Sequence, residues 1–270
     1  MFREMTLGQY YHGNSVIHRL DPRVKLAGTL IFVISLFLGK SMPALLCASI
    51  FLAWVIFLSG LPLRMMLKGV KPLFIIILFS AFFNLFGSKG SVILTLGPLT
   101  VTKEGLWTAF FLVVRLIYLV VGTSVMTYTT TPNRLTDGLE KSLAFLNHIH
   151  VPVHEIAMMM SIALRFIPIL TEELDKIMKA QMSRGASFSE GNLLQKARQI
   201  TPVLVPLFVS SVRRASDLAL AMEARAYHGG SGRTKLHPLR YGRRDFLAYG
   251  ILLLYLILMI WLAGNHPLVL

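Results

Sequence analysis

Long apolar stretches alternate with short polar or basic stretches along most of the chain. Five of them lie at residues 26–38, 44–58, 72–86, 106–128 and 246–263. A membrane-spanning helix needs roughly 20 apolar residues, so the first two stretches are short but are together too long for one span. We expect them to form a tight helical hairpin with Lys40 at its outer turn. The pattern predicts an all-α integral membrane protein with about five transmembrane helices.

The segments between these stretches differ in character. Residues 60–71 carry Arg64, Lys68 and Lys71, which predicts a basic cytoplasmic loop. In residues 91–101, apolar residues alternate with polar or small ones, and Gly97-Pro98 follows. Alternation of this kind beside a turn sequence predicts a short β-hairpin, placed on the extracellular face.

The second half of the chain has helical rather than continuous apolar patterning. Residues 133–147 have leucines on one stripe, which predicts a surface helix beside the membrane. Residues 153–183 and 193–227 predict two long amphipathic helices, kinked at Pro168, Pro202 and Pro206. The first of these is long enough to begin inside the membrane and to leave it. We therefore divide the chain into residues 1–128, with an N-terminal cytoplasmic segment and four transmembrane helices, 129–244, a cytoplasmic domain, and 245–270, a final transmembrane helix and tail.

Composition supports a membrane protein. Apolar residues make up 54% of the 270 residues, charged residues 15%, and the formal net charge is +14. The basic residues cluster between the apolar stretches, as the positive-inside rule expects for cytoplasmic segments, and we do not expect nucleic-acid binding. An uncleaved chain with a cytoplasmic N-terminus in a prokaryotic cell membrane is predicted. The lone cysteine, Cys47, allows no disulfide within the chain.

Arg115 is the one basic residue expected at membrane depth. A charge there costs a few kcal/mol unless a polar partner satisfies it. We expect Arg115 to face the helix bundle, either as a structural hydrogen-bond anchor, which we favour, or as part of a transport path.

The sequence contains no motif of a catalytic centre. No phosphate-binding P-loop, no G-x-S-x-G and no H-E-x-x-H sequence is present. Glu172 and Glu173 are expected to lie on a solvated helix face. His148, His150 and His154 are interrupted by Pro152, which favours a plain interfacial loop over a metal site. We expect no enzyme activity, no cofactor and no metal.

Two arginine motifs remain, one near the end of each long helix. The first is Ser183-Arg184-Gly185 and the second is Ala224-Arg225-Ala226. Gly185 fits a helix end, so Arg184 could simply complement the helix dipole. This explanation is weaker for Arg225, whose next glycine is Gly229. We favour a shared role in which small neighbours allow close approach and each arginine binds a partner's carboxylate.

These residues, in this order and spacing, resemble the EcfT family, the transmembrane coupling subunit of energy-coupling factor transporters. The resemblance covers nearly the whole chain. It begins at Leu20-Asp21-Pro22-Arg23-Val24-Lys25, is densest from Thr136 to Pro168, and continues through both arginine motifs to Thr234.

The resemblance implies that this chain transmits ATP-driven motion from two ABC-type ATPase subunits to a membrane-embedded S component, which captures a vitamin or a trace metal. It implies that Ser183, Arg184, Gly185, Ala224, Arg225 and Ala226 dock onto the ATPases. Apolar faces of the two long helices, rich in Met and Ala, would hold the S component. Ser183 stands where Ala is common in the family. Ala226 stands where Gly is common, so we expect the second groove to be contacted less closely. The alternatives are a self-contained secondary transporter or channel, which would need more polar groups in the spans, and a membrane anchor, which would not explain two matched arginines.

Overall fold

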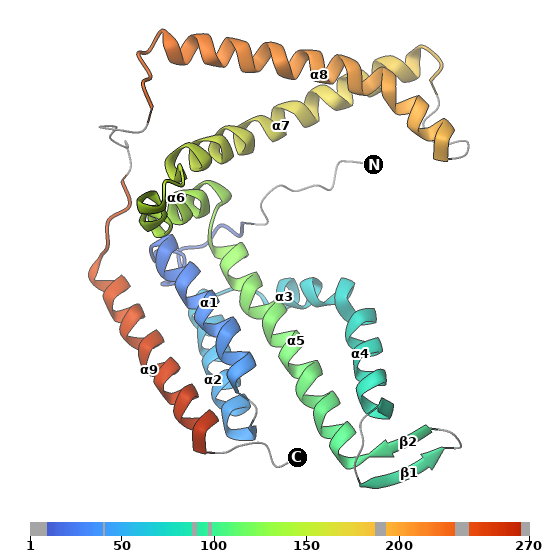
Figure 1. Ribbon diagram of the computed structural model, residues 1–270, viewed down its shortest axis with the longest axis vertical. Coiled ribbons are helices and arrows are strands. Elements are labelled where there is room, and N and C mark those ends of the chain that lie inside the picture. Colours follow the sequence, from blue (N-terminus) through green and yellow to red (C-terminus); the bar gives the residue numbers. More distant parts are fainter. Residues whose placement is uncertain are drawn as a thin grey trace. The chain divides into compact units, whose positions relative to one another are not determined.

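The chain folds into two compact groups of helices. The computed structural model describes residues 10–39, 41–87, 91–96, 99–186, 193–229 and 238–265 (Figure 1). Met1–Lys141 and Leu239–Leu270 form one unit, here called the bundle unit, and Ser142–Pro238 form the other, here called the helix-pair unit. Lys40 and the Gly97-Pro98 turn, about which the sequence made predictions, lie outside the described residues.

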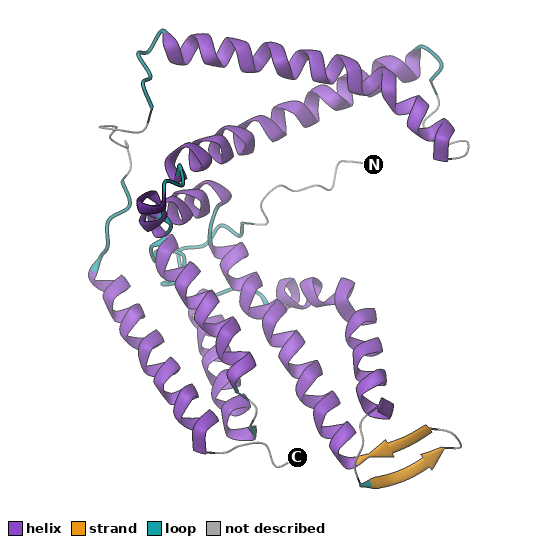
Figure 2. Cartoon of the chain, in the orientation of Figure 1, coloured by secondary structure: helices purple, strands orange, loops and turns teal. Residues whose placement is uncertain are grey.

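Nearly all of the described chain is helical, which confirms the all-α prediction (Figure 2). The bundle unit contains α1 (Pro22–Leu38), α2 (Met42–Ser59), α3 (Leu63–Val70), α4 (Phe74–Gly87), α5 (Lys103–Thr129), α6 (Pro132–Ser142) and α9 (Arg243–Asn265). A short 3₁₀ turn, Lys71–Leu73, joins α3 to α4. The helix-pair unit contains α7 (Val153–Ser183) and α8 (Leu193–Glu223).

Five helices among the described residues are long and apolar enough to cross a membrane. They are Met42–Ser59, Leu63–Gly87, Lys103–Thr129, Val153–Ser183 and Arg243–Gly264. A multi-pass membrane protein is therefore confirmed, although the five differ from those predicted. The helix α1 has 17 residues and is not among them, whereas α7 is.

Aromatic packing holds the centre of the bundle unit. Phe51 of α2 stacks on Tyr255 of α9, with ring centroids 4.1 Å apart. The Tyr255 hydroxyl lies 2.7 Å from Ser35 Oγ of α1. On α5, a Cβ at Gly122 would lie 2.5 Å from Phe32 Cε1, so only glycine allows α1 to approach this closely.

The predicted basic loop at 60–71 is wrong, because most of it is the helix α3. Leu63, Met66 and Leu67 lie at positions i, i+3 and i+4, with Val70 one turn further. This spacing places them on one face, and Met66 is buried in the core. Arg64 and Lys68 are exposed on another face, so the basic residues mark one side of an amphipathic helix and not a loop.

The predicted β-hairpin is confirmed. Strands β1 (Val92–Leu96) and β2 (Leu99–Thr102) pair antiparallel, with Leu96 opposite Leu99 (Figure 2). Thr102 then caps α5 by accepting a hydrogen bond from the Gly105 amide.

The predicted surface helix at 133–147 is shorter than expected. The α-helix ends at Ser142, and a 3₁₀ segment, η2 (Ala144–Ile149), follows it. The buried positions of α6 are Thr136 and Gly138 and not the leucine stripe. A Cβ at Gly138 would lie 2.8 Å from Pro22 Cβ, so close packing on α1 selects the small residue.

Arg115 satisfies its charge within the bundle. Its Nη2 donates a hydrogen bond to the carbonyl oxygen of Gly39 over 3.1 Å, and its guanidinium lies 5.7 Å from the centroid of the Phe37 ring. Because Gly39 is the C-cap of α1, a cation at this carbonyl also complements the helix dipole. Arg115 therefore faces the helix bundle, as expected, and its role as a structural anchor stays a prediction.

Candidate functional site

The two long helices of the helix-pair unit run antiparallel and cross each other (Figure 1). Near the crossing, Glu173 of α7 accepts hydrogen bonds from Ser210 and Arg214 of α8, with Arg214 Nη2 2.7 Å from the carboxylate. Further along, the Gln181 amide donates to the Pro202 carbonyl over 3.4 Å. A side-chain cluster therefore fixes where α7 and α8 meet.

The solvated role expected for Glu173 is wrong. Its side chain is only 22% exposed and lies against α8, whereas its neighbour Glu172 is exposed. Ser210 and Arg214 are four residues apart and so share one face of α8. That spacing was a usable signal for a carboxylate partner, but it names no specific one among the acidic residues of α7.

The end of α7 is a complete Schellman motif around Arg184. Arg184 is the C-cap, and Gly185 follows in the left-handed conformation with φ of +88°. The Gly185 amide donates to the Met182 carbonyl, and the Ala186 amide donates to the Gln181 carbonyl, both over 3.0 Å. These two bonds define the motif and satisfy carbonyls that would otherwise lack partners.

The end of α8 repeats this motif around Arg225. Ala226 takes the left-handed position with φ of +54°. Its amide donates to the Glu223 carbonyl over 2.8 Å, and the Tyr227 amide donates to the Met222 carbonyl over 3.1 Å. The expectation that Arg225 fits a helix end less well than Arg184 is therefore wrong, because an alanine here does what a glycine usually does.

All six residues of the two motifs are exposed. Each arginine stands at the C-terminal end of a helix, where the dipole favours a cation. Because the helices are antiparallel, the two motifs lie apart. The end of α7, which carries Arg184, meets the first half of α8 near Pro202. The end of α8, which carries Arg225, lies near the first half of α7. The structure thus presents two equivalent arginines at two separate places.

A hollow of about 710 Å³ lies beside Arg225, between the diverging parts of α7 and α8. Arg165 and His228 line it together with Arg225 and with apolar side chains that include Phe166 and Met222. Arg165 was not predicted to lie near Arg225. The two residues are 60 positions apart, and only the antiparallel pairing of α7 and α8 brings them to one hollow.

An apolar stripe runs along the exposed side of α8. It consists of Leu204, Val205, Phe208, Val209 and Val212, which are 56%, 56%, 69%, 53% and 48% exposed. The spacing i, i+1, i+4, i+5 and i+8 places them on one face. A contiguous apolar surface of this kind marks contact with a membrane or another protein.

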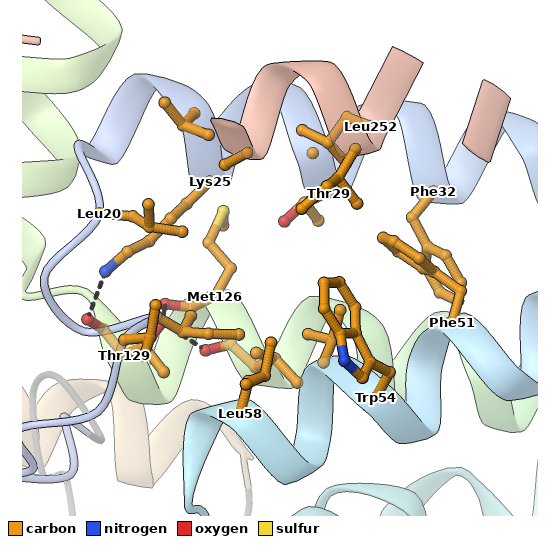
Figure 3. Close-up of a pocket in the computed structure, with 18 of the residues that line it drawn as sticks. Leu20, Lys25, Thr29, Phe32, Phe51, Trp54, Leu58, Met126, Thr129 and Leu252 are labelled. Carbon is orange, nitrogen blue, oxygen red and sulfur yellow. Dashed lines mark hydrogen bonds between the residues drawn. The ribbon is translucent and has the colours of Figure 1, made fainter. Parts of the chain in front are cut away.

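An apolar cavity of about 330 Å³ lies within the bundle unit, walled by α1, α2, α5 and α9 (Figure 3). Phe32, Phe51, Trp54 and Leu252 form part of its wall, and Lys25 and Arg244 are the charged residues that line it. Lys25 already donates to three oxygens of the protein. The cavity therefore offers packing surface and little chemistry.

The histidines predicted to be a plain loop lie on different elements. His148 is in η2, where its Nδ1 lies 3.2 Å from the Phe145 carbonyl oxygen. His150 is the C-cap of that segment, and His154 is the second residue of α7. In the part of the chain that the structure describes, no three His, Cys, Asp or Glu side chains are grouped to hold a metal ion.

The chain is similar in sequence to known proteins over nearly its whole length. Residues 13–236 match the protein family described as "Cobalt transport protein" (CbiQ). The "Energy-coupling factor transporter transmembrane protein EcfT" of Thermosediminibacter oceani is 53% identical over 258 residues, which cover 93% of this chain and 96% of the relative. Proteins of the same name from Acidaminococcus fermentans and Bacillus subtilis are 47% and 44% identical, over 99% and 91% of this chain and 100% and 93% of their own lengths.

Proposed function

This chain belongs to the EcfT family of energy-coupling factor transporter transmembrane proteins, and from that premise we propose that it couples two ATPase subunits to a substrate-capturing membrane subunit. Family membership makes it a transmembrane component of an energy-coupling factor transporter. ATP hydrolysis belongs to the partners in this proposal, and the chain itself transmits motion.

One observation carries the docking part of the proposal. Arg184 and Arg225 occupy the same C-cap position in two matching Schellman motifs, and both are exposed. Stability alone does not require arginine at either position, since the hydrogen bonds of the motif come from the backbone. Two equivalent cations at separate helix ends suit two similar acidic grooves, one on each of two related ATPase subunits.

The surroundings of Arg225 differ from those of Arg184. Arg225 borders the 710 Å³ hollow that Arg165 also lines, whereas Arg184 is the C-cap of a helix that Gly185 closes. Ala226 carries a methyl group where Gly185 has none, so an ATPase surface can approach Gly185 more closely. We infer that the two contacts differ in closeness while sharing the arginine.

The capture subunit would rest on the apolar stripe of α8. Its five exposed side chains are Val, Leu and Phe, while exposed methionines, Met159 and Met160, lie on α7. Adaptable apolar surfaces suit a partner that must be held and released within a bilayer. The class of cargo in this proposal is a vitamin or trace metal. The positive-inside pattern supports a cytoplasmic location for the N-terminus and for the arginine-bearing ends of α7 and α8.

Co-purification from membranes with the two candidate ATPase subunits tests the docking. The variants are Arg184→Glu, Arg225→Glu and both together, each checked for membrane insertion and thermal stability. Arg213→Glu is the matched control, because Arg213 is an exposed arginine within α8 and not at its end. We expect the double variant to lose both ATPases and the control to keep them.

The opposite result has a clear meaning. If the double variant binds the ATPases as well as the wild type does, the arginines are helix caps only and the docking assignment fails. If the wild type binds no ATPase but transports a solute alone, the chain acts as a self-contained transporter.

A further inference from the structure

The first turn of α1 contacts both chain segments that connect the helix-pair unit to the bundle. The helix-pair unit is inserted in the chain between Lys141 and Leu239. Two connections therefore reach it: the end of α5 with α6 on one side, and residues 239–242 before α9 on the other. All of the contacts described next lie inside the bundle unit.

Lys25 holds the incoming connection where α5 ends. Its Nζ donates to the Thr129 carbonyl over 2.9 Å (Figure 3) and to Thr130 Oγ1 over 3.2 Å. It also donates to the His18 carbonyl over 3.3 Å, and the residue is 8% exposed. A buried ammonium with its three donors used fixes the backbone at this point.

Pro22 contacts the incoming connection at the next helix, α6. Gly138 of α6 packs so closely that a Cβ would lie 2.8 Å from Pro22 Cβ and 3.4 Å from Leu26 Cδ1. Because Gly138 has no side chain, the α6 backbone lies directly against Pro22, and α6 cannot move against α1 without losing this contact.

Arg23 holds the outgoing connection. Its Nη2 donates to the Leu239 carbonyl over 3.1 Å, and its guanidinium lies 4.4 Å from the centroid of the Tyr241 ring. Stacking and hydrogen bonding together use the planar guanidinium in a way that lysine cannot copy.

Asp21 and Asp245 complete the contact with α9. Asp245 Oδ1 accepts from the Asp21 amide and Oδ2 accepts from the Gly242 amide, each over 2.8 Å. Asp21 Oδ1 accepts from the Arg23 amide and so caps α1. Both carboxylates are buried, with the residues 7% and 5% exposed.

We propose that Asp21, Pro22, Arg23 and Lys25 form a clasp through which motion of α7 and α8 is transmitted to the bundle. The proposal rests on the coupling function proposed above. The four residues belong to one hexapeptide, Leu20-Asp21-Pro22-Arg23-Val24-Lys25, and each holds a different part of the two connections. A loose connection would absorb motion of the helix-pair unit, whereas a clasped one passes it to α1, α5 and α9. The clasp residues are positioning residues.

The test measures nucleotide-driven distance changes in the full transporter complex, in a Cys47→Ser background. One spin-label pair, at Met159 and Leu220, reports motion within the helix-pair unit. A second pair, at Phe110 of α5 and Leu254 of α9, reports motion within the bundle. All four positions are exposed. The nucleotide states compared are nucleotide-free and ATP with vanadate.

Arg23→Ala is the principal variant, and Arg19→Ala, at an exposed arginine outside the clasp, is the matched control. We expect wild type and control to show both distance changes. Arg23→Ala should keep the change in the helix-pair unit and lose at least half of the change in the bundle. A merely structural role would lower the amount of folded complex and leave the ratio of the two changes intact.

Arg23→Lys decides the question if Arg23→Ala does not assemble, because lysine keeps the charge and loses the planar stacking on Tyr241. An intermediate ratio supports the clasp. Equal ratios in wild type and an assembled Arg23 variant overturn it. A wild-type complex in which the helix-pair unit itself does not respond to nucleotide instead contradicts the proposed coupling function, so the two failures are distinguishable.

Discussion

Gly185 and Ala226 adopt the same left-handed backbone conformation, one residue after the arginine that ends each long helix. Their φ angles are +88° and +54°, and the same pair of backbone hydrogen bonds closes both helix ends. The left-handed region is easy for glycine and costs an L-residue roughly 1–2 kcal/mol. The second motif therefore keeps its shape with a residue that opposes it, which indicates that a methyl group is tolerated at this exposed position.

Exchanging these two residues should have opposite effects on stability. Ala226→Gly removes the strain, but part of the gain is offset by the greater freedom of the unfolded glycine, so we expect a net gain of about 0.5 kcal/mol. Gly185→Ala introduces strain and should cost about 1 kcal/mol. Thermal unfolding of the purified protein measures both. A loss of stability in Ala226→Gly would contradict the left-handed assignment at this residue.

The sequence predicted the helices and strands better than it predicted the contacts between them. Apolar length and helical periodicity were enough to place α5 and α7, and alternation beside a turn sequence was enough to place the hairpin, since these signals depend on neighbours along the chain. The basic residues of α3 were mistaken for a loop because charge was weighed above the spacing of Leu63, Met66 and Leu67. The end of α8 was misjudged because no local rule selects alanine for a left-handed cap.

Contacts between segments that are distant in the chain could not be predicted from the sequence. The cap of α1 is a local contact, in which Asp21 accepts a hydrogen bond from the Arg23 amide two residues away. Nothing in the pattern indicated that Asp21 would also meet Asp245, 224 positions away, or that Glu173 would bind Arg214. Such pairings depend on the packing of whole helices, which periodicity does not encode. The docking role of the two arginine motifs stays a prediction for the same reason, because the partner surfaces belong to other chains.

Glu173→Gln should loosen the crossing of α7 and α8. The carboxylate receives bonds from Ser210 and from two nitrogens of Arg214, and a neutral amide replaces only part of them. We expect a broader distribution of distances between spin labels at Met159 and Leu220. Glu172→Gln, at the exposed neighbour, is the control and should leave the distribution unchanged. Reversing the charges, with Glu173→Arg and Arg214→Glu together, should narrow it again, and an equally broad distribution in that double variant would show that the ion pair does not set the crossing.

Arg115→Leu should lower stability without changing the capture of ATPases. The variant loses the charged hydrogen bond to the Gly39 carbonyl, and bonds to charged groups contribute about 1.5–3 kcal/mol. We expect a loss of about 1–2 kcal/mol, since leucine also removes the cost of holding a charge at membrane depth. Thermal unfolding and co-purification measure the two properties separately. Unchanged stability together with lost transport would instead indicate a role in the solute path.

Titration of Lys25 should make the stability of the folded protein depend on pH in the alkaline range. Burial, with Arg134 adding repulsion, lowers the pKa of Lys25 from its usual 10.5 to about 8. Between these values the unfolded chain binds the proton more strongly than the folded protein, so stability rises as pH increases from about 8 toward 10.5. The difference between 10.5 and about 8 corresponds to roughly 3 kcal/mol. The Lys25→Met variant cannot titrate, so its thermal midpoint should lack this rise. We would measure thermal midpoints of both proteins from pH 7 to pH 10, and parallel curves would show that the buried ammonium is not destabilised in the folded protein.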